Sequence, residues 1–226
     1  MEKIKNRLLT ALFGIATALL VITFSIGLPI YFRPFYYMQI EPLGIPERTG
    51  FDYDTVKSSY DELLDYLTVP GNEFSTGAFA HSEDGKSHFE DCKVLFDLNI
   101  CVLLASLSLI IILKLLEWRG VFKMSRPFGL DVGFSVGSFT LAAFAILALL
   151  VSMNFDLAFE IFHAVLFPGK DNWIFNPRLD PIIGAMPAQF FMNCAILIVS
   201  SIIILTAAMI AVSLLKKKFS SVAKKK

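Results

Sequence analysis

The stretch AQFFMNCAILIVSSIIILTAAMIAVSLL, residues 188–215, contains no charged side chain and exceeds the roughly 20 residues with which an α-helix crosses a bilayer. Three further apolar stretches of similar length lie at residues 8–32, 95–116 and 132–155. Of these, 95–116 alone carries charged residues, Asp97 and Lys114, and both lie near its ends. Hydrophobic residues make up 55% of the 226, and the mean hydropathy is +0.64. The sequence therefore predicts an all-α integral membrane protein with four transmembrane helices.

The first apolar stretch follows three basic residues, Lys3, Lys5 and Arg7, a flank that also precedes secretory signal peptides. Its apolar run is longer than the hydrophobic region of a signal peptide, and no small-residue cleavage site follows it. We therefore expect residues 8–32 to stay in the protein as its first transmembrane helix.

Charge is unevenly shared among the segments that connect the apolar stretches. The N-terminus, residues 114–131 and the tail after 215 hold thirteen of the 20 basic residues and three of the 20 acidic ones. The segments 33–97 and 156–180 hold the rest and are strongly acidic. Because basic segments stay in the cytoplasm, we expect both termini inside and the acidic segments outside. The lysines of the tail would then attract anionic membrane lipid of the inner leaflet.

The two outer segments, residues 33–94 and 156–187, are too short and too aromatic to form a separate domain. We expect them to build a small, mainly helical extracellular cap at the membrane interface. Together with the four apolar helices, this cap would complete a single membrane domain that spans residues 1–226.

Within the longer outer segment, the apolar spacing at 54–67 predicts an amphipathic helix, because its apolar residues recur on one helical face. Pro70-Gly71 follows and would end that helix. Residues 34–43 have a less regular pattern, and we expect them to be extended.

All three histidines of the chain, His81, His88 and His163, fall in the segments expected to face outward. Imidazole is the side chain that most readily exchanges protons near neutral pH, so these positions are the first candidates for chemistry. The alternative for each is a histidine at the membrane interface that has no catalytic task.

Ser87 and Glu90 have the S-x-x-E spacing of a capping box just before the second apolar stretch. This spacing predicts that Ser87 caps the helix, which places His88 in the first turn. There the positive end of the helix dipole disfavours an imidazolium, so the ring would be neutral and able to accept a proton. Asp91 shares the same helical face and is a candidate to fix the ring tautomer.

A second candidate site follows the third apolar stretch. Asp156, Glu160 and His163 are spaced so that a helix would carry them on one face, and Pro168-Gly169 would end that helix. Charged residues this close to hydrocarbon usually face a bundle interior or a wet cavity. We therefore favour one site shared with His88 over the alternative, an amphipathic helix lying at the membrane surface.

The motif His88-Phe89-Glu90-Asp91-Cys92-Lys93, which leads into the second apolar stretch, is similar to the first signature of the bacterial lipoprotein intramolecular transacylases. Further motifs resemble the second signature: Phe162-His163, Phe167-Pro168-Gly169-Lys170-Asp171-Asn172-Trp173, Asp180-Pro181, and Pro187 to Phe190-Phe191. Length, expected spans and outer cap agree, so the resemblance covers nearly the whole chain. Cys92 stands where a branched apolar residue is expected, a departure that concerns packing more than mechanism.

The resemblance implies a particular reaction in the bacterial plasma membrane. The substrate would be a lipoprotein whose N-terminal cysteine carries a thioether-linked diacylglyceryl group and a free α-amine. The enzyme would move the sn-2 acyl chain to that amine and leave the lyso-form lipoprotein, without a covalent acyl-enzyme. This reaction implies no cofactor, no metal and no nucleic-acid partner, and the oligomeric state stays open.

The resemblance also implies site residues on the outer face. His88 and His163 would be the catalytic pair, with His88 the preferred base and the reverse assignment nearly as good. The residues with orienting or supporting roles would be Asp91, Glu160, Asn172, Trp173 and Asp180, of which Asn172 and Trp173 are candidate oxyanion donors. The aromatic residues of the substrate pocket would be Phe89, Phe162, Phe167 and Phe191.

Other interpretations of the sequence are weaker. Residues 133–137 match the G-x-S-x-G nucleophile motif, but they open an apolar stretch, where small residues usually serve helix packing. A membrane metallohydrolase could use His81, His88 and nearby carboxylates, yet the H-E-x-x-H spacing is absent. A non-enzymatic assembly or sensor protein is the remaining alternative, since such proteins need no histidine chemistry.

Overall fold

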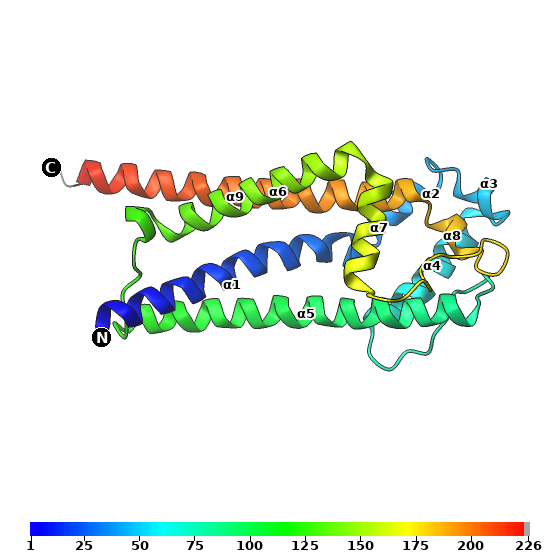
Figure 1. The fold of residues 1–226 in the computed structure, drawn as a ribbon, viewed down its shortest axis with the longest axis horizontal. Coiled ribbons are helices and arrows are strands. Elements are labelled where there is room, and N and C mark those ends of the chain that lie inside the picture. The colour runs from blue at the N-terminus through cyan, green and yellow to red at the C-terminus, as the bar shows by residue number, and fades with distance from the viewer. Residues whose placement is uncertain (224–226) are drawn as a thin grey trace. The chain divides into compact units, whose positions relative to one another are not determined.

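The structure, a computed structural model, describes residues 1–223, and within that range it contains helices and loops but no strand. The helices, in chain order, are α1 Glu2–Tyr31, α2 Pro34–Ile40, α3 Ile45–Thr49, α4 Tyr53–Thr68, α5 Glu83–Trp118, the 3-10 helix η1 Pro127–Gly129, α6 Val132–Met153, α7 Phe155–Leu166, α8 Ile182–Ala185 and α9 Ala188–Ala223 (Figure 1). The predicted all-α class is confirmed.

Four of these helices, α1, α5, α6 and α9, are long and apolar enough to cross a membrane. Their outer faces keep large apolar side chains exposed, for example Phe139, Ile146 and Ile204. Such surfaces are stable when hydrocarbon covers them, because lipid tails replace water around the side chains. The predicted four transmembrane helices are therefore confirmed, and the protein is a multi-pass membrane protein.

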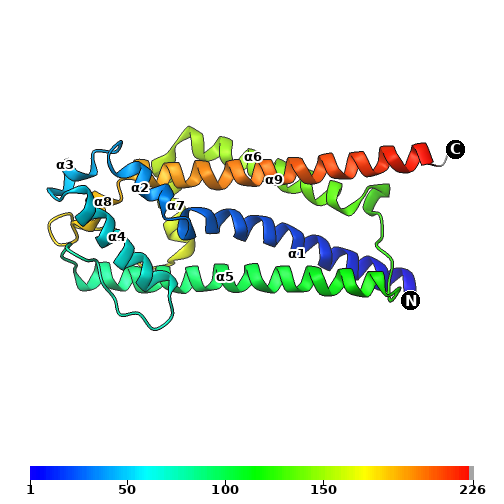
Figure 2. The ribbon, with the colours of Figure 1, turned by 180° about the vertical axis from the view of Figure 1, so that it is seen from behind.

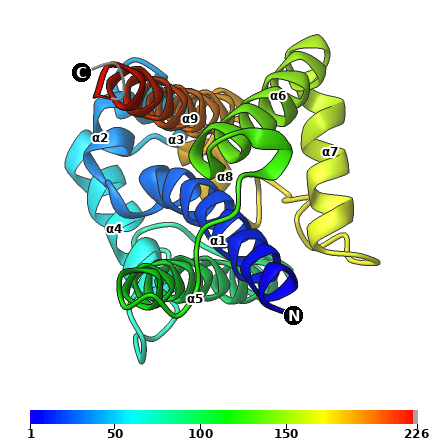
Figure 3. The ribbon, with the colours of Figure 1, turned by 90° about the vertical axis from the view of Figure 1, so that its left-hand side faces the viewer.

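The chain divides into two compact units, described separately below. The first comprises Met1–Ser25, Ile100–Leu149 and the chain from Val199 on. Within it, α1 lies between α5 on one side and α6 and α9 on the other (Figures 2 and 3). The Ser213 hydroxyl donates to the Asp131 carboxylate over 2.8 Å and thereby joins α9 to the start of α6.

The G-x-S-x-G match lies in this first unit, on α6. A Cβ at Gly137 would come within 3.0 Å of Ile210 and 3.1 Å of the Thr206 carbonyl oxygen, both on α9. The glycine therefore permits the close approach of two helices, as the packing interpretation predicts.

The second unit comprises Ile26–Asn99 and Leu150–Ile198. Its core forms where α4 packs against α2 and α3, and α3 packs against α8. Tyr36 stacks on Tyr60 with ring centroids 3.7 Å apart, and its hydroxyl donates to the Ala185 carbonyl over 2.8 Å. Burying these aromatic rings with their polar ends bonded stabilises the unit.

Residues 34–43, expected to be extended, begin with helix α2, so that expectation was wrong. Pro34 occupies the first turn, where its fixed φ suits a helix and its missing N–H is not needed. Tyr36 and Ile40 are one helical turn apart, and both are buried in the core. Tertiary packing thus decides a conformation that the local pattern left weakly defined.

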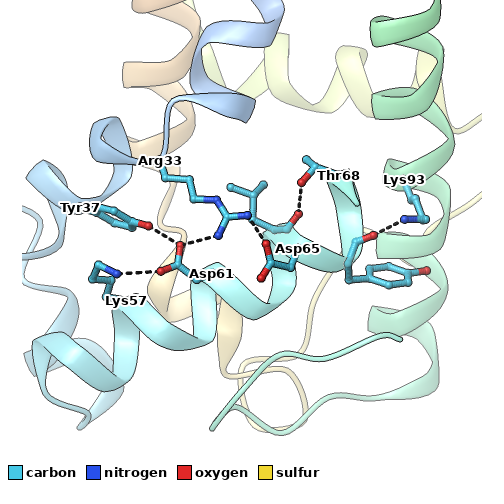
Figure 4. A network of polar contacts seen from close by, with 9 residues as sticks. Arg33, Tyr37, Lys57, Asp61, Asp65, Thr68 and Lys93 are labelled. Atoms are coloured by element: carbon cyan, nitrogen blue, oxygen red, sulfur yellow. Dashed lines mark hydrogen bonds and ion pairs between the residues drawn. The ribbon is translucent and has the colours of Figure 1, made fainter. Parts of the chain in front are cut away.

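The amphipathic helix predicted at 54–67 is present as α4 and ends two residues before Pro70. Asp52 caps it by accepting from the Thr55 N–H over 2.8 Å. Its polar face holds a network in which Arg33 pairs with Asp61 at 3.0 Å and with Asp65 (Figure 4). The network connects the segment after α1 to α4.

A glycine between α4 and α5 provides a test of this packing. Gly77 has a φ of +58°, and a Cβ there would lie 2.5 Å from the Ser59 Cα. We expect Gly77→Ala to cost about 3 kcal/mol or more, because a left-handed alanine and a backbone clash add together. Thermal unfolding in detergent should show a large drop in Tm.

The matched control for this experiment is Gly71→Ala. Gly71 also has a positive φ, +86°, but no atom lies within 4 Å of its added Cβ. Only the penalty of a left-handed alanine, about 1–2 kcal/mol, should remain. Equal Tm changes in the two variants would contradict the packing described for Gly77.

Candidate active site

The start of α5 is fixed by a contact with a distant part of the chain. The Asp180 carboxylate is 3% exposed and accepts from the Ser82 N–H at 2.7 Å and from the Ser82 hydroxyl. The Ser82 hydroxyl oxygen in turn accepts from the Gly85 N–H at 3.0 Å, as a helix cap does. Asp180 therefore supports the helix that carries His88.

This cap corrects the predicted capping box. Because α5 begins at Glu83, Ser87 lies inside the helix, and His88 lies in its second turn. The helix dipole is then a weaker reason for a neutral ring than the sequence suggested, since its effect falls off within the first turn. His88 still precedes the apolar stretch 95–116, so it lies outside the membrane-spanning segment.

The two predicted catalytic histidines lie side by side in the second unit. His88 on α5 is 6% exposed and His163 on α7 is 7% exposed, and their ring centroids are 5.9 Å apart. His81 lies elsewhere, exposed, with its Nδ1 3.2 Å from the Thr76 hydroxyl. The structure thus brings two of the three histidines together.

The tautomer of His163 follows from its backbone contact. Asn154 caps α7 by accepting from the Leu157 N–H. Further along α7, His163 Nδ1 lies 2.8 Å from the carbonyl oxygen of Phe159, one helical turn before it. A carbonyl oxygen only accepts, so Nδ1 carries the proton, and Nε2 keeps its lone pair. Trp173 stacks on the ring at 4.4 Å and holds its plane.

Aromatic rings enclose the pair. Phe167 contacts both histidines, with its centroid 4.9 Å from His88 and 5.7 Å from His163. Phe175 lies 5.5 Å from His88 and stacks on Phe89. The pair is therefore shielded from water on these sides.

The other predicted pocket aromatics lie further out. Phe162 meets the His163 ring edge-on but is half exposed, and Phe191 contacts Phe159 rather than either histidine. Sequence analysis did not select Phe175. The sequence feature that could have indicated Phe175 was its position three residues after Asn172, in the loop that follows α7.

Asp91 was predicted to orient a histidine directly, but its contacts go to two other residues. Lys170 Nζ lies 2.5 Å from Asp91 Oδ1, and the Asn172 amide donates to Asp91 Oδ2 at 3.2 Å. The nearby ammonium of Lys170 holds the pKa of Asp91 below its ordinary value. Asp91 therefore positions Asn172, and Asn172 faces the site.

The Asn172 side chain has a fixed orientation. Its Nδ2 group donates to Asp91 and, at 3.4 Å, to the Ser87 hydroxyl, so its oxygen points away from both. That oxygen, Oδ1, is buried and forms no hydrogen bond of ordinary geometry among residues 1–223, although Asn172 lies close enough to His88 to favour its protonated form. An unpaired buried acceptor is costly, which makes it a candidate contact for a bound substrate.

His88 has one engaged and one free nitrogen. Nε2 lies 3.4 Å from the Cys92 sulfur, while Nδ1 is buried without a partner in the described part of the chain. Burial raises the pKa of the Cys92 thiol to about 12, so it stays protonated and able to donate to Nε2. The proton of the neutral ring would then lie on Nδ1.

Burial also decides the charge of both rings. Burial above all, together with the nearby His163, lowers the pKa of His88 to about 4, although Asp91 and Asn172 favour the protonated form. The pKa of His163 is lowered by burial too, partly offset by the Phe159 carbonyl. Both imidazoles are therefore neutral at pH 7.

The remaining predicted site residues have plainer surroundings. Glu160 and Asp156 are exposed on α7, whereas His163 is buried. Within residues 1–223, no three histidine, cysteine or acidic side chains lie close enough together to hold a metal ion.

Comparison with known proteins identifies the family. Residues 11–191 match the sequence model described as lipoprotein intramolecular transacylase Lit. A search of curated proteins finds no match. Among solved structures, the membrane integral lipoprotein intramolecular transacylase Lit from Bacillus cereus is similar with a TM-score of 0.85 and 26% identity, covering 96% of this chain and 98% of that one.

Two further Bacillus cereus Lit structures are similar, each with a histidine replaced. The arginine variant has a TM-score of 0.78, with 25% identity over 96% of this chain and 95% of that one. The alanine variant has a TM-score of 0.76, with 25% identity over 95% of this chain and 96% of that one. Four membrane helices and a buried polar site thus define an integral membrane enzyme. The chain belongs to the lipoprotein intramolecular transacylase family and is a transacylase.

Proposed function

We propose that this enzyme moves the sn-2 acyl chain of a diacylglyceryl lipoprotein onto the α-amine of that lipoprotein's own N-terminal cysteine. The observation that carries the proposal is the buried pair of neutral histidines, His88 and His163, with ring centroids 5.9 Å apart. Family membership supplies the substrate class, and the pair supplies groups that can manage the protons.

The reaction exchanges one bond for another. The α-amine nitrogen bonds to the acyl carbon, the ester bond to the glyceryl oxygen breaks, and one proton passes from nitrogen to oxygen. The cyclic transition state contains about eight atoms, so holding amine and ester together is where binding contributes most. The aromatic surroundings of the pair suit a diacylglyceryl group bent in this way.

His163 is the better candidate for moving the proton. Its Nδ1–H is held by the Phe159 carbonyl, so Nε2 can take a proton from the attacking amine and then give it to the glyceryl oxygen. The preference for His88 as base rested on a first-turn position that α5 does not provide. We therefore assign the base to His163.

His88 acts in this proposal as a neutral hydrogen-bond donor. A pKa of about 4 keeps the ring uncharged throughout, and its unpaired Nδ1–H can donate to the developing oxyanion. Asn172 was a candidate oxyanion donor, but its N–H bonds go to Asp91 and Ser87. Its free Oδ1 suits an N–H of the substrate amine instead.

A covalent acyl-enzyme has little support at this site. The Cys92 sulfur lies 3.4 Å from His88 Nε2, and burial raises the pKa of its thiol to about 12. The thiolate needed for attack would then be scarce at neutral pH. Direct attack by the amine requires no such group.

The charge pattern supports an outward-facing site. The basic segments lie at the two termini and between α5 and α6, so both termini would be cytoplasmic. The acidic second unit, with the histidine pair, would then face the outside of a bacterial plasma membrane. The substrate tails could remain in hydrocarbon while the polar head bends inside.

A crossover experiment tests the proposed reaction. Two diacylglyceryl lipopeptides of different sequence, one with a deuterated sn-2 chain, are incubated together with the purified enzyme. Fragmentation should find the deuterated acyl group only on the α-amine of the peptide that carried it. Label on the other peptide's amine, or amines that stay free, would overturn the proposal.

The pH profile offers a second test. Below about pH 8 the substrate α-amine becomes protonated, so log kcat/KM should fall with a slope of one. An imidazole of ordinary pKa, about 6.5, would be half protonated at pH 6.5 and would raise the slope there to about 1.5. Because the pKa values of both histidines are lowered, the slope at pH 6.5 should stay closer to one. A slope of about 1.5 or more at pH 6.5 would contradict buried, neutral rings.

A further inference from the structure

A long hollow of about 750 Å³ lies in the first unit, between α1 and the start of α6. Its walls are mostly apolar, with the small residues Ala11, Gly14 and Ala18 on α1 and the larger Val132, Val136 and Phe139 on α6. From Arg7 to Ala18 the lining follows α1 for about 16 Å at 1.5 Å per residue. These dimensions fit one extended acyl chain.

One end of this groove is basic. Arg7 and Arg126 both line it, and both are exposed. Neither forms an ion pair with a carboxylate within residues 1–223, although the ion pair of Lys114 with Glu117, at 2.9 Å, lies in the same unit. Two unpaired guanidinium groups beside an apolar groove favour a ligand with an anionic head and an apolar tail.

A neighbouring hollow of about 680 Å³ shares Arg126 but has a mixed lining, in which Lys114 and Lys216 stand beside the carboxylates of Glu117 and Asp131. Lys114 is paired with Glu117 at 2.9 Å, so these carboxylates already offset part of the positive charge. In the 750 Å³ groove the charged lining residues are all basic.

We propose that this groove binds one anionic phospholipid, with an acyl chain along α1 and its phosphate between Arg7 and Arg126. Guanidinium groups bind phosphate oxygens in a bidentate manner, and basic pockets between membrane helices bind lipid head groups in this way. In the orientation proposed above, the lipid comes from the cytoplasmic leaflet. The groove shares no residue with the histidine pair.

Native mass spectrometry of the delipidated protein tests the site directly. Phosphatidylglycerol, phosphatidylcholine and inorganic phosphate are added separately to the wild type. We expect retained phosphatidylglycerol, at least tenfold more than phosphatidylcholine, and no retained phosphate. Equal retention of the two lipids, or retention of inorganic phosphate alone, would overturn the proposal.

Variants separate the site from general charge. Arg7→Gln/Arg126→Gln should lose the preference for phosphatidylglycerol, whereas Lys3→Gln/Lys123→Gln removes the same charge outside the groove and should keep it. Ala18→Phe fills the groove and should lower retention with both arginines intact. Equal loss in the two charge variants, with unchanged Tm, would reject the site. Acyl transfer is measured separately, so neither proposal depends on the other.

Discussion

His163→Asn is expected to lower kcat for acyl transfer by about 10²–10⁴, the range for loss of a general base. Asparagine keeps an N–H near the position of Nδ1, so the bond to the Phe159 carbonyl can persist. What it removes is the basic lone pair of Nε2. The loss should therefore appear in kcat while the fold, measured by Tm, stays close to that of the wild type.

The matched control for His163 is Glu160→Gln on the same helix. Glu160 is exposed, so the Glu160→Gln enzyme should keep an activity within about twofold of wild type, as expected for a surface substitution away from a site. A His163→Asn enzyme that keeps a third or more of wild-type kcat would exclude His163 as the base.

Substitution of His88 should have the second-largest effect. His88→Ala removes the proposed oxyanion donor, and we expect a loss of about 10²–10³ in kcat. His88→Asn places an N–H near the position of Nδ1, whereas His88→Gln places one near Nε2, beside Cys92. If Nδ1–H is the donor, the asparagine variant should retain more activity than the glutamine variant.

The two histidines should also be coupled. Groups that act as a unit are strongly non-additive, so His88→Ala/His163→Ala should be only a few-fold slower than the worse single variant. If the loss in the double variant instead equals the product of the two single losses, the two residues act independently. Single-turnover measurements separate this chemical step from product release.

The membrane helices could be predicted from the sequence because their signal is local. Each apolar stretch is long enough by itself, and no partner elsewhere in the chain is needed to define it. The amphipathic pattern of α4 was sufficient for the same reason. The start of α5 and the partners of Asp91 depended on distant contacts, and there the prediction failed.

The start of α5 shows that dependence. The spacing of Ser87 and Glu90 favoured a cap there, but Asp180, far along the chain, bonds Ser82 and moves the cap upstream. The charge pattern and the expected spans predicted that His88 and His163 lie in segments on the same side of the membrane. The distance between their rings could be obtained only from the fold.

The contacts of Asp91 show the same limit. Lys170 and Asn172, which bond it, lie about eighty residues further along the chain. Cys92, which was expected to concern packing more than mechanism, lies beside His88 Nε2. Helical spacing could name neighbours on α5 but could not reveal partners from the loop after α7.

The most direct test of the account is tandem mass spectrometry of a diacylglyceryl lipopeptide incubated with wild type, His163→Asn and His88→Ala. Intact mass does not change when an acyl chain moves within one molecule, so fragmentation must report the acylated α-amine. The account predicts N-acyl fragments with the wild type and near-complete loss with each folded variant. Undiminished N-acylation by both variants would contradict the two-histidine site.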